Sequence, residues 1–150
     1  MKTAICYYSR HHGNTRKVVQ AMAETQPVDL IDVTLQSETD LSGYDLIGFA
    51  SGIYGFDVSP ALVQFIRKKL PPGKRVFFVY TYGGAKGSGV KSARQAALEK
   101  GAEILGEFGC KGYDTFGPFR LVGGLAKGHP TSDELQRARE FFRALSERQS

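Results

Sequence analysis

Two adjacent histidines, His11 and His12, stand in a short polar segment between an apolar run and a helical pattern. The segment, residues 9–15, reads SRHHGNT, so serine, threonine, asparagine and glycine surround the pair. Imidazoles in such a place can bind a metal ion, act as a general base or donate hydrogen bonds to an anion. These three kinds of chemistry belong to different classes of protein, and the neighbouring residues help to separate them.

The neighbouring residues favour an anion. A zinc site needs at least a third ligand, and the segment contains no Cys, Asp or Glu. Ser9 and Thr15 supply hydroxyl donors, Gly13 permits a tight turn, and the free N–H groups at the start of the next helix favour negative charge. The patterns GxxxxGK[ST] and GxGxxG are absent, and the missing lysine argues against a nucleoside triphosphate. The segment predicts a phosphate monoester site, with an ordinary capped glycine loop as the alternative.

Short apolar runs alternate with amphipathic stretches along the chain. The apolar runs are typical of buried strands, and the amphipathic stretches have helical spacing. The predicted strands are residues 3–8, 28–33, 45–50, 75–81 and 102–110. The predicted helices are residues 14–25, 59–70, 88–100 and 131–147. Ser59 and Pro60 indicate the start of the second helix, and Thr131 and Glu134 have the spacing of a capping box for the last.

This alternation predicts an α/β fold. Strands joined through helices imply right-handed crossovers and a parallel sheet covered on both faces, so we expect one three-layer, doubly wound domain over residues 1–150 with a five-stranded parallel sheet. Ligands of such sheets bind beyond the carboxyl ends of the strands. The loops after the first, third and fourth strands read SRHHGNT, SGIYGFDVSP and TYGGAKGSG, and all are rich in glycine and hydroxyl groups. Together these three loops form the predicted binding site.

Composition limits the class of protein. A chain of 150 residues that is 41% hydrophobic suits one core. No apolar run approaches the roughly 20 residues of a membrane span, and no signal peptide is evident, so we expect a cytoplasmic protein without membrane insertion. The two cysteines, Cys6 and Cys110, lie in apolar runs and are expected to be reduced packing residues.

The net charge of +5 is distributed unevenly. Residues 1–23 carry +4, residues 24–57 carry −7 and residues 58–150 carry +8. Because no run of five or six like charges occurs, a nucleic-acid partner is not expected. The basic balance instead suggests acidic partners.

The first loop also carries a family resemblance. SRHHGNT at the start of the first helix resembles the phosphate loop of flavodoxins, commonly written (S/T)xTGNT, and the order of elements and the glycine-aromatic loops are similar over the whole chain. The resemblance implies a flavodoxin-like sheet of order 2-1-3-4-5, bound flavin mononucleotide (FMN) without a metal, and electron transfer. The phosphate-loop residues that it implies are Ser9, Arg10, His11, His12, Gly13, Asn14 and Thr15.

His12 departs from the family pattern, which usually has threonine at this place. A neutral imidazole can donate one hydrogen bond as a hydroxyl does, and protonation would add positive charge opposite the phosphate. We therefore predict that phosphate binding is retained and becomes dependent on pH. A general-base role is disfavoured, because the phosphate end should lie away from the reacting ring, and no catalytic residue is predicted.

The second loop resembles the flavodoxin segment that covers one face of the flavin ring. Its implied cofactor-binding residues are Ser51, Gly52, Ile53, Tyr54, Gly55 and Phe56. Tyr54 is the predicted stacking residue and Phe56 is the competing choice, because an aromatic side chain gains contact area against a flat ring. The backbone freedom of Gly55 would let its carbonyl turn toward flavin N5. The alternative is that both rings are core or surface aromatics.

The third loop is less decisive. Its implied cofactor-binding residues are Thr81, Tyr82, Gly83 and Gly84, whose backbone N–H groups would bond the pyrimidine edge of the flavin. Family members often have a second stacking aromatic just after the Tyr-Gly pair, but this chain has Gly84 there. The absence of an aromatic side chain at position 84 could leave one face of the flavin ring open to a substrate.

Two functions remain open. The first, favoured by the lack of a nicotinamide-binding domain, is an electron carrier that shuttles electrons between redox proteins. The second is an FMN-dependent oxidoreductase of the quinone reductase or protoporphyrinogen-oxidising type, which Gly84 and the long segment 111–130 keep open. Segment 111–130 is long for a loop, and its apolar side chains would cover either the flavin edge or one end of the sheet. The four apolar residues expected to do so are Phe116, Pro118, Phe119 and Leu121. The oligomeric state is not indicated.

Overall fold

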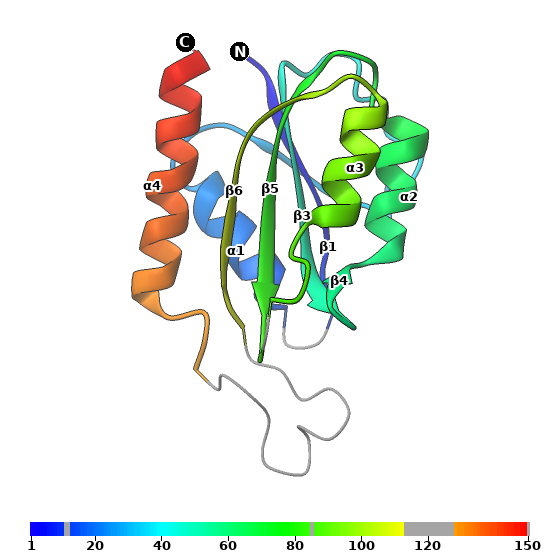
Figure 1. Cartoon of the computed structure of the whole chain (residues 1–150). Coiled ribbons are helices and arrows are strands. Elements are labelled where there is room, and N and C mark those ends of the chain that lie inside the picture. The colour runs from blue at the N-terminus through cyan, green and yellow to red at the C-terminus, as the bar shows by residue number, and fades with distance from the viewer. Residues whose placement is uncertain (11–12, 85, 113–127, 150) are drawn as a thin grey trace.

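The computed structural model describes residues 1–10, 13–84, 86–112 and 128–149, and within them helices cover both faces of a central sheet (Figure 1). The strands are β1 (Thr3–Tyr8), β2 (Asp29–Asp32), β3 (Leu46–Tyr54), β4 (Asp57–Val58), β5 (Arg75–Tyr82) and β6 (Glu103–Lys111). The helices are α1 (Asn14–Ala23), α2 (Pro60–Lys69), α3 (Lys91–Glu99) and α4 (Ser132–Gln149). The chain thus forms the three-layer α/β fold predicted from its sequence.

The sheet has the expected strand order. Its main strands run parallel in the order β2-β1-β3-β5-β6, which is the predicted 2-1-3-4-5 once the two-residue β4 is set aside. Helices α1 and α4 pack on one face, and α2 and α3 on the other (Figure 1). The direction of the connections reverses between β1 and β3, so the carboxyl ends of these strands form a topological switch point.

The central strands are buried on both faces. Phe78 packs beneath α2 and α3, whereas its neighbour Phe77 packs with Phe142 of α4, as expected from the alternation of side chains along a strand. Gly48 makes room for this packing, because a Cβ there would come within 2.3 Å of the Phe77 ring. Cys6 and Cys110 are buried free thiols, as predicted.

Two helix starts follow the predicted capping signals. The Ser59 hydroxyl accepts a hydrogen bond from the Ala61 amide at 3.2 Å, with Pro60 at the start of α2. Before α4, the Glu134 amide donates to Thr131 Oγ1 at 3.1 Å and the Thr131 amide donates to Glu134 Oε1 at 3.0 Å. Both bonds of the capping box are therefore present, and such caps stabilise a helix by about 1 kcal/mol.

The structure corrects the predicted end of the third strand. β3 continues through Tyr54 instead of ending at Ala50, and its last residues pair with the antiparallel β4. Residues 51–54, predicted to lie in a loop, are thus strand residues, and Gly55 and Phe56 form the turn between β3 and β4. Both turn residues have a positive φ, of 62° and 74° respectively.

The helix predicted from Ser88 begins later, at Lys91. Gly87 and Gly89 have φ values of 56° and 61°, in the left-handed region that a right-handed helix cannot contain. Residues 87–90 therefore form a turn before α3. Among the residues described, no helix is both long and apolar enough to cross a bilayer.

Candidate functional site

The second and third predicted loops meet at the carboxyl edge of the sheet. The amide and hydroxyl of Ser88 both donate to the Phe56 carbonyl, at 2.9 and 2.7 Å. Gly87 lies so close that a Cβ on it would come within 2.5 Å of the same carbonyl oxygen. Only glycine at position 87 permits this approach, so the turn between β3 and β4 rests directly on the loop after β5.

The first loop joins the other two through side chains. Thr15 Oγ1 and Thr81 Oγ1 lie 3.0 Å apart, which links the start of α1 to the end of β5. The rings of Tyr8 and Tyr54 meet edge to face with centroids 5.9 Å apart, which links the ends of β1 and β3. The predicted convergence of the three loops is thus confirmed by their contacts.

The first loop turns at Gly13, as predicted. Gly13 precedes α1 with φ 64° and ψ 32°, and it has no side chain with which to cap the helix. The Ser9 hydroxyl instead accepts a hydrogen bond from the Arg16 amide at 3.3 Å, while the Arg10 guanidinium donates to the Tyr8 hydroxyl at 3.2 Å. The N-terminal amides of α1 and its dipole favour an anion at this turn. His11 and His12 lie outside the described residues.

Asn14 and Thr15 tie the start of α1 to the sheet. Thr15 is 1% exposed, and its hydroxyl bonds that of Thr81, which is 3% exposed. The Asn14 side chain packs against Gly112, where a Cβ would come within 2.7 Å of Asn14 Cγ. When Thr15 accepts the hydrogen bond from the Thr81 hydroxyl, the Thr15 hydroxyl can donate its own proton to a second acceptor. The observed bond therefore leaves Thr15 able to bind a further partner.

Ser51 and Gly52 lie inside the fold. The buried Ser51 hydroxyl donates to the Gly52 carbonyl at 2.7 Å and accepts from the Ser59 amide at 3.0 Å. A Cβ on Gly52 would come within 2.8 Å of the Tyr54 hydroxyl. Ser51 therefore fixes the start of α2, and Gly52 gives the Tyr54 side chain its place, whereas the half-buried Ile53 pairs with Val58.

The turn at Gly55 and Phe56 exposes an aromatic ring. Phe56 is 71% exposed and holds a left-handed backbone, which costs about 1–2 kcal/mol for a residue with a Cβ. The bonds from Ser88 hold this conformation in place. Gly55 is exposed, and a Cβ on it would point into open space, with no atom within 4 Å. Strained residues of this kind cluster at ligand sites.

The third loop contributes backbone groups. The Tyr82 carbonyl accepts a hydrogen bond from the Gly112 amide at 2.9 Å, which joins the ends of β5 and β6. Gly83 is half-buried and Gly84 is exposed, and neither has a side chain that would cover a ligand. Their amides can approach a polar ring edge closely.

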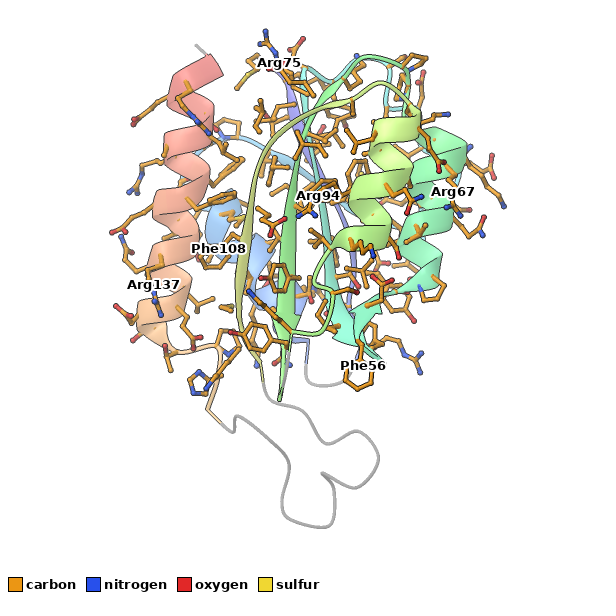
Figure 2. The ribbon with its side chains drawn as sticks, in the orientation of Figure 1. Phe56, Arg67, Arg75, Arg94, Phe108 and Arg137 are labelled. Atoms are coloured by element: carbon orange, nitrogen blue, oxygen red, sulfur yellow. The ribbon has the colours of Figure 1, made fainter. Side chains whose placement is uncertain are left out.

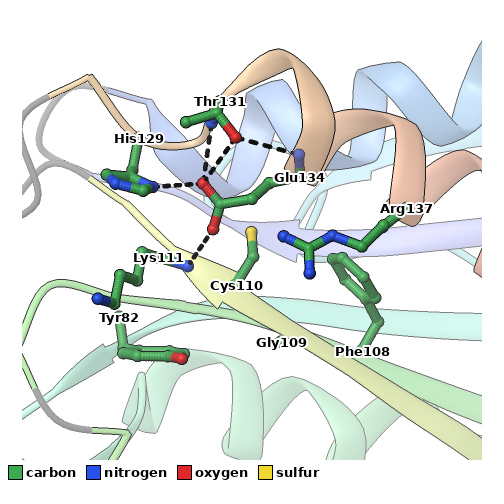
Figure 3. A pocket seen from close by; sticks show the side chains of 9 residues that line it. All are labelled: Tyr82, Phe108, Gly109, Cys110, Lys111, His129, Thr131, Glu134 and Arg137. Carbon is green, nitrogen blue, oxygen red and sulfur yellow. Dashed lines mark hydrogen bonds and ion pairs between the residues drawn. The ribbon is translucent and has the colours of Figure 1, made fainter.

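A second group of residues lies beside these loops, at the ends of β5 and β6 and the start of α4 (Figure 3). The group surrounds a pocket of about 370 Å³. The residues that line it are Tyr82, Phe108, Gly109, Cys110, Lys111, His129, Thr131, Glu134 and Arg137. The sequence indicated the capping box of Thr131 and Glu134 but not this pocket. Figure 2 shows Phe56 at the β4 side of this end of the molecule and Arg137 at the α4 side.

Glu134 is the centre of this group. Its Oε1 accepts from the Thr131 amide and hydroxyl and is bonded to His129 Nδ1, while its Oε2 accepts from the Lys111 amide at 3.1 Å. Burial by itself raises the pKa of Glu134, but the hydrogen bonds from Thr131, His129 and Lys111 outweigh it and hold the pKa below its usual value. Glu134 is therefore an ionised carboxylate that connects the end of β6 to the start of α4.

Comparison with known proteins identifies the family. Residues 4–112 match the family model described as a flavodoxin domain. The chain belongs to the flavodoxin family. It is 40% identical to an uncharacterized protein of Methanocaldococcus jannaschii over 147 residues, which are 97% of this chain and 98% of that protein.

Solved flavodoxins have the same fold. Oxidised flavodoxin 2 from Bacillus cereus is 18% identical with a TM-score of 0.73, and 99% of each chain is covered. A Fusobacterium nucleatum flavodoxin bound to flavin mononucleotide is 11% identical with a TM-score of 0.70, again over 99% of each chain. The rubredoxin oxygen:oxidoreductase of Desulfovibrio gigas matches 99% of this flavodoxin-family chain with 37% of its own length, at 17% identity and a TM-score of 0.72. The flavodoxin fold thus occurs both alone and within larger oxidoreductases.

Proposed function

We propose that this flavodoxin-family protein binds FMN at the carboxyl edge of its sheet and carries electrons between redox proteins. The observation that carries the proposal is the contact of three loops at this edge, through the Thr15–Thr81 bond, the Ser88–Phe56 bonds and the Tyr8–Tyr54 rings. The amide and hydroxyl donors of the first loop fit a phosphate, and the aromatic side chains and glycine amides of the other two loops fit a flat ring. The Fusobacterium nucleatum flavodoxin, which has the same fold, binds this cofactor.

The phosphate end is proposed at the turn before α1. Gly13 would let the chain wrap around the anion, the first amides of α1 would donate to it, and Ser9 and Thr15 would add hydroxyl groups. Arg10, Asn14 and the histidines His11 and His12 complete the proposed loop. No lysine or metal ion is required, because a helix N-terminus with several hydroxyl groups can hold a phosphate monoester.

The ring end is proposed beside the turn between β3 and β4. Tyr54 is the proposed stacking residue, because its ring lies against Tyr8 between the first two loops. Phe56, which is 71% exposed, is the competing aromatic. Gly55 has the positive φ and the open surroundings that let its carbonyl face a ligand, and the amides of Gly83 and Gly84 would bond the polar edge of the ring.

Bound FMN supplies the capacity to accept and donate one or two electrons. The protein's own residues then have three tasks, which are to hold the phosphate, to orient the ring and to keep water from its covered face. An electron carrier needs no substrate-specific catalytic residue, and none is proposed. The net charge of +5 favours acidic redox partners, with screening limiting the attraction to about 8–10 Å at physiological salt. We propose that the protein acts in the cytoplasm as a single flavodoxin-like domain.

A second candidate function is an FMN-dependent oxidoreductase of the quinone reductase or protoporphyrinogen-oxidising type. The observation that favours it is the exposed Gly84, which leaves the third loop without a ring to cover the second flavin face. A substrate could then approach that face directly. The pocket beside Tyr82 adds a concave surface next to the same loop.

Anaerobic reduction of the purified protein, reconstituted with FMN, separates these functions. A carrier is expected to take up its electrons in two distinct one-electron steps and to reduce a soluble quinone slowly. An oxidoreductase is expected to be reduced in a single two-electron step and to be reoxidised rapidly by the quinone. A protein that remains colourless after incubation with FMN would contradict both functions.

A further inference from the structure

Strand β6 is the long outer edge of the sheet. Within the described residues it pairs with β5 alone, and it spans nine residues, whereas the opposite edge strand, β2, spans four. Helices α3 and α4 lie beside it on the two faces of the sheet (Figure 1). Cys110 is the one buried residue of β6, so the rest of the strand retains contact with solvent. A long unpaired edge is a template for pairing with another chain.

The backbone groups of β6 face alternately toward β5 and outward. The Gly112 amide donates to the Tyr82 carbonyl at 2.9 Å, across the sheet, whereas the Lys111 amide donates to Glu134 at 3.1 Å. Successive residues of a strand point their N–H and C=O groups to opposite sides, and the register with β5 is regular from Gly106 onward. Glu107 and Gly109 therefore share the outward direction of Lys111.

Helix α4 closes this edge at both ends and leaves its middle open. At one end Glu134 binds the Lys111 amide, and at the other Arg148 donates to the Leu105 carbonyl at 3.4 Å, beside the irregularity in the pairing with β5. No hydrogen bond from the described residues reaches the outward groups of Glu107 or Gly109. These two residues are thus available to a further strand.

The open groups are complementary to themselves. If two β6 strands pair antiparallel about a twofold axis at Phe108, Glu107 of each copy faces Gly109 of the other. Each of these facing pairs can exchange both of its N–H···O bonds. The occupied Lys111 amide and Leu105 carbonyl are not needed, so the pairing uses the groups that α4 leaves open.

The side chains on both faces also fit this pairing. Figure 2 shows Phe108 on the α4 side of β6 and Arg94 on the α3 side. The half-buried Phe108 packs on Phe141, with ring centroids 5.7 Å apart, and the two Phe108 rings would meet at the twofold axis as a stabilising cross-strand pair. On the other face Glu107 forms an ion pair with Arg94. Glu107 of the second copy would lie between this neutralised pair and the Lys111 ammonium, so the added charges attract.

We propose that two copies of this chain associate through β6, as an antiparallel pair centred on Phe108 that continues the sheet across the dimer. The occupant of the edge is a second copy because the edge presents its own complement, with Gly109 opposite Glu107 and Phe108 opposite itself. No residue of this edge belongs to the loops proposed to bind FMN, so the dimer does not depend on the proposed function.

The first test combines sedimentation velocity with amide hydrogen exchange followed by nuclear magnetic resonance, on the full chain. Sedimentation should shift from monomer toward dimer as the concentration rises to about 1 mM, because a pairing of small area is weak. Exchange at Glu107 and Gly109 should slow in step with the fraction of dimer. The Lys111 amide is the internal control, because Glu134 protects it at every concentration.

Two substitutions at one position separate the backbone from the side chain. Glu107→Pro removes the outward N–H and should weaken dimerisation by about tenfold or more, and proline is tolerated on an edge whose N–H faces solvent. Glu107→Thr removes the same charge and the ion pair with Arg94 but keeps the N–H. The threonine variant should change dimerisation by less than about threefold.

Cross-linking tests the register independently of the proline variant. Phe108→Cys places the two new thiols opposite each other at the twofold axis, so mild oxidation should join the copies through a disulfide. Arg143→Cys, at an exposed position of α4, is the control and should remain monomeric. The native Cys6 and Cys110 are buried and do not compete.

Four results would overturn the proposal. The first is a monomer at every concentration, and the second is an equal effect of Glu107→Pro and Glu107→Thr on the dimer. The third is equal cross-linking of the two cysteine variants. The fourth is slow exchange of Glu107 and Gly109 in the monomer, because the chain itself would then cover this edge.

Discussion

The two sides of the carboxyl edge are built differently. At the switch point, the three loops are shaped by backbone conformation, with left-handed residues such as Gly13, Gly55 and Phe56. Between β6 and α4, one carboxylate, Glu134, collects hydrogen bonds from separate parts of the chain. Loops that depend on backbone conformation should lose stability when a Cβ is added to a glycine. A region that depends on a buried carboxylate should lose stability when that charge is removed by mutation or by acid. This difference can be tested one side at a time.

The largest effect is expected at Gly87. Gly87→Ala should lower the free energy of unfolding by about 3 kcal/mol or more, because strain at φ 56° adds to the close approach of the new Cβ to the Phe56 backbone. Gly89→Ala is the matched control, since its φ is 61° and its nearest atom would be 4.0 Å away. Only the strain of about 1–2 kcal/mol should appear there. Equal losses in urea unfolding would show that the contact between the second and third loops is absent.

The Thr15–Thr81 bond tests whether the first loop also binds phosphate. Thr15→Ala should weaken FMN binding by about 1.5–3 kcal/mol if its hydroxyl bonds the charged phosphate. Thr81→Val, which removes the other hydroxyl of the pair, should affect folding stability similarly but FMN affinity less. Isothermal titration of both variants measures the difference. If the two variants lose the same affinity, Thr15 serves only to join α1 to β5.

On the other side of the edge, Glu134→Gln should lower stability by about 1–2 kcal/mol at neutral pH, because it weakens the capping box and removes the charge that accepts four hydrogen bonds. The folded pKa of Glu134 lies below its ordinary value of 4.5, so this stability is present above about pH 4.5 and is lost as the pH falls through the folded pKa. The difference between wild type and variant should therefore shrink in acid.

The matched control for this effect is Glu140→Gln, at an exposed position of the same helix. Its change in stability should stay within about 0.5 kcal/mol at every pH. Urea unfolding at several pH values measures both variants. A Glu134→Gln difference that stays constant from neutral to acid pH would mean that the carboxylate is not held ionised by its bonds.

The smallest effect is expected at His12. If its imidazole faces the phosphate, protonation should strengthen FMN binding by about 0.5–1 kcal/mol as the pH falls from 8 to 5.5, relative to His12→Thr. The threonine variant carries the residue usual in the family. Because the FMN phosphate also changes its charge over this pH range, and does so in both proteins, the comparison isolates the effect of the imidazole. Binding isotherms at several pH values check this. Parallel curves for the two proteins would show that His12 only replaces a hydroxyl.

Much of the fold could be predicted because its signals are local. β1 has the predicted bounds, and the caps at Ser59 and Thr131 form the predicted bonds. The extension of β3 was missed because it depends on pairing with the two-residue β4, which no periodicity reveals. The late start of α3 was missed because Gly89, inside the predicted helix, has a left-handed φ of 61°, and its amide donates to the Lys86 carbonyl in a turn instead.

The meeting of the three loops was also predictable from the sequence. Loop composition and the switch-point rule indicated where three loops would meet, and their contacts confirm it. The pocket beside them was missed, because it needs β6 and α4 to be brought together around Glu134. Its one signal in the sequence was the capping-box glutamate, which explains two of the bonds that Glu134 makes but not those to His129 and Lys111. The apolar residues expected to cover the flavin edge or the sheet, Phe116, Pro118, Phe119 and Leu121, lie outside the described residues.

The most direct test of FMN binding at the carboxyl edge is a fluorescence titration that compares FMN with riboflavin. The two ligands have the same ring, and only FMN carries the phosphate proposed to lie at Gly13 and the start of α1. Several charge-assisted hydrogen bonds to that phosphate should make FMN bind about 100-fold or more tightly than riboflavin. Equal affinities, or no saturable binding of FMN, would contradict the assignment of the first loop.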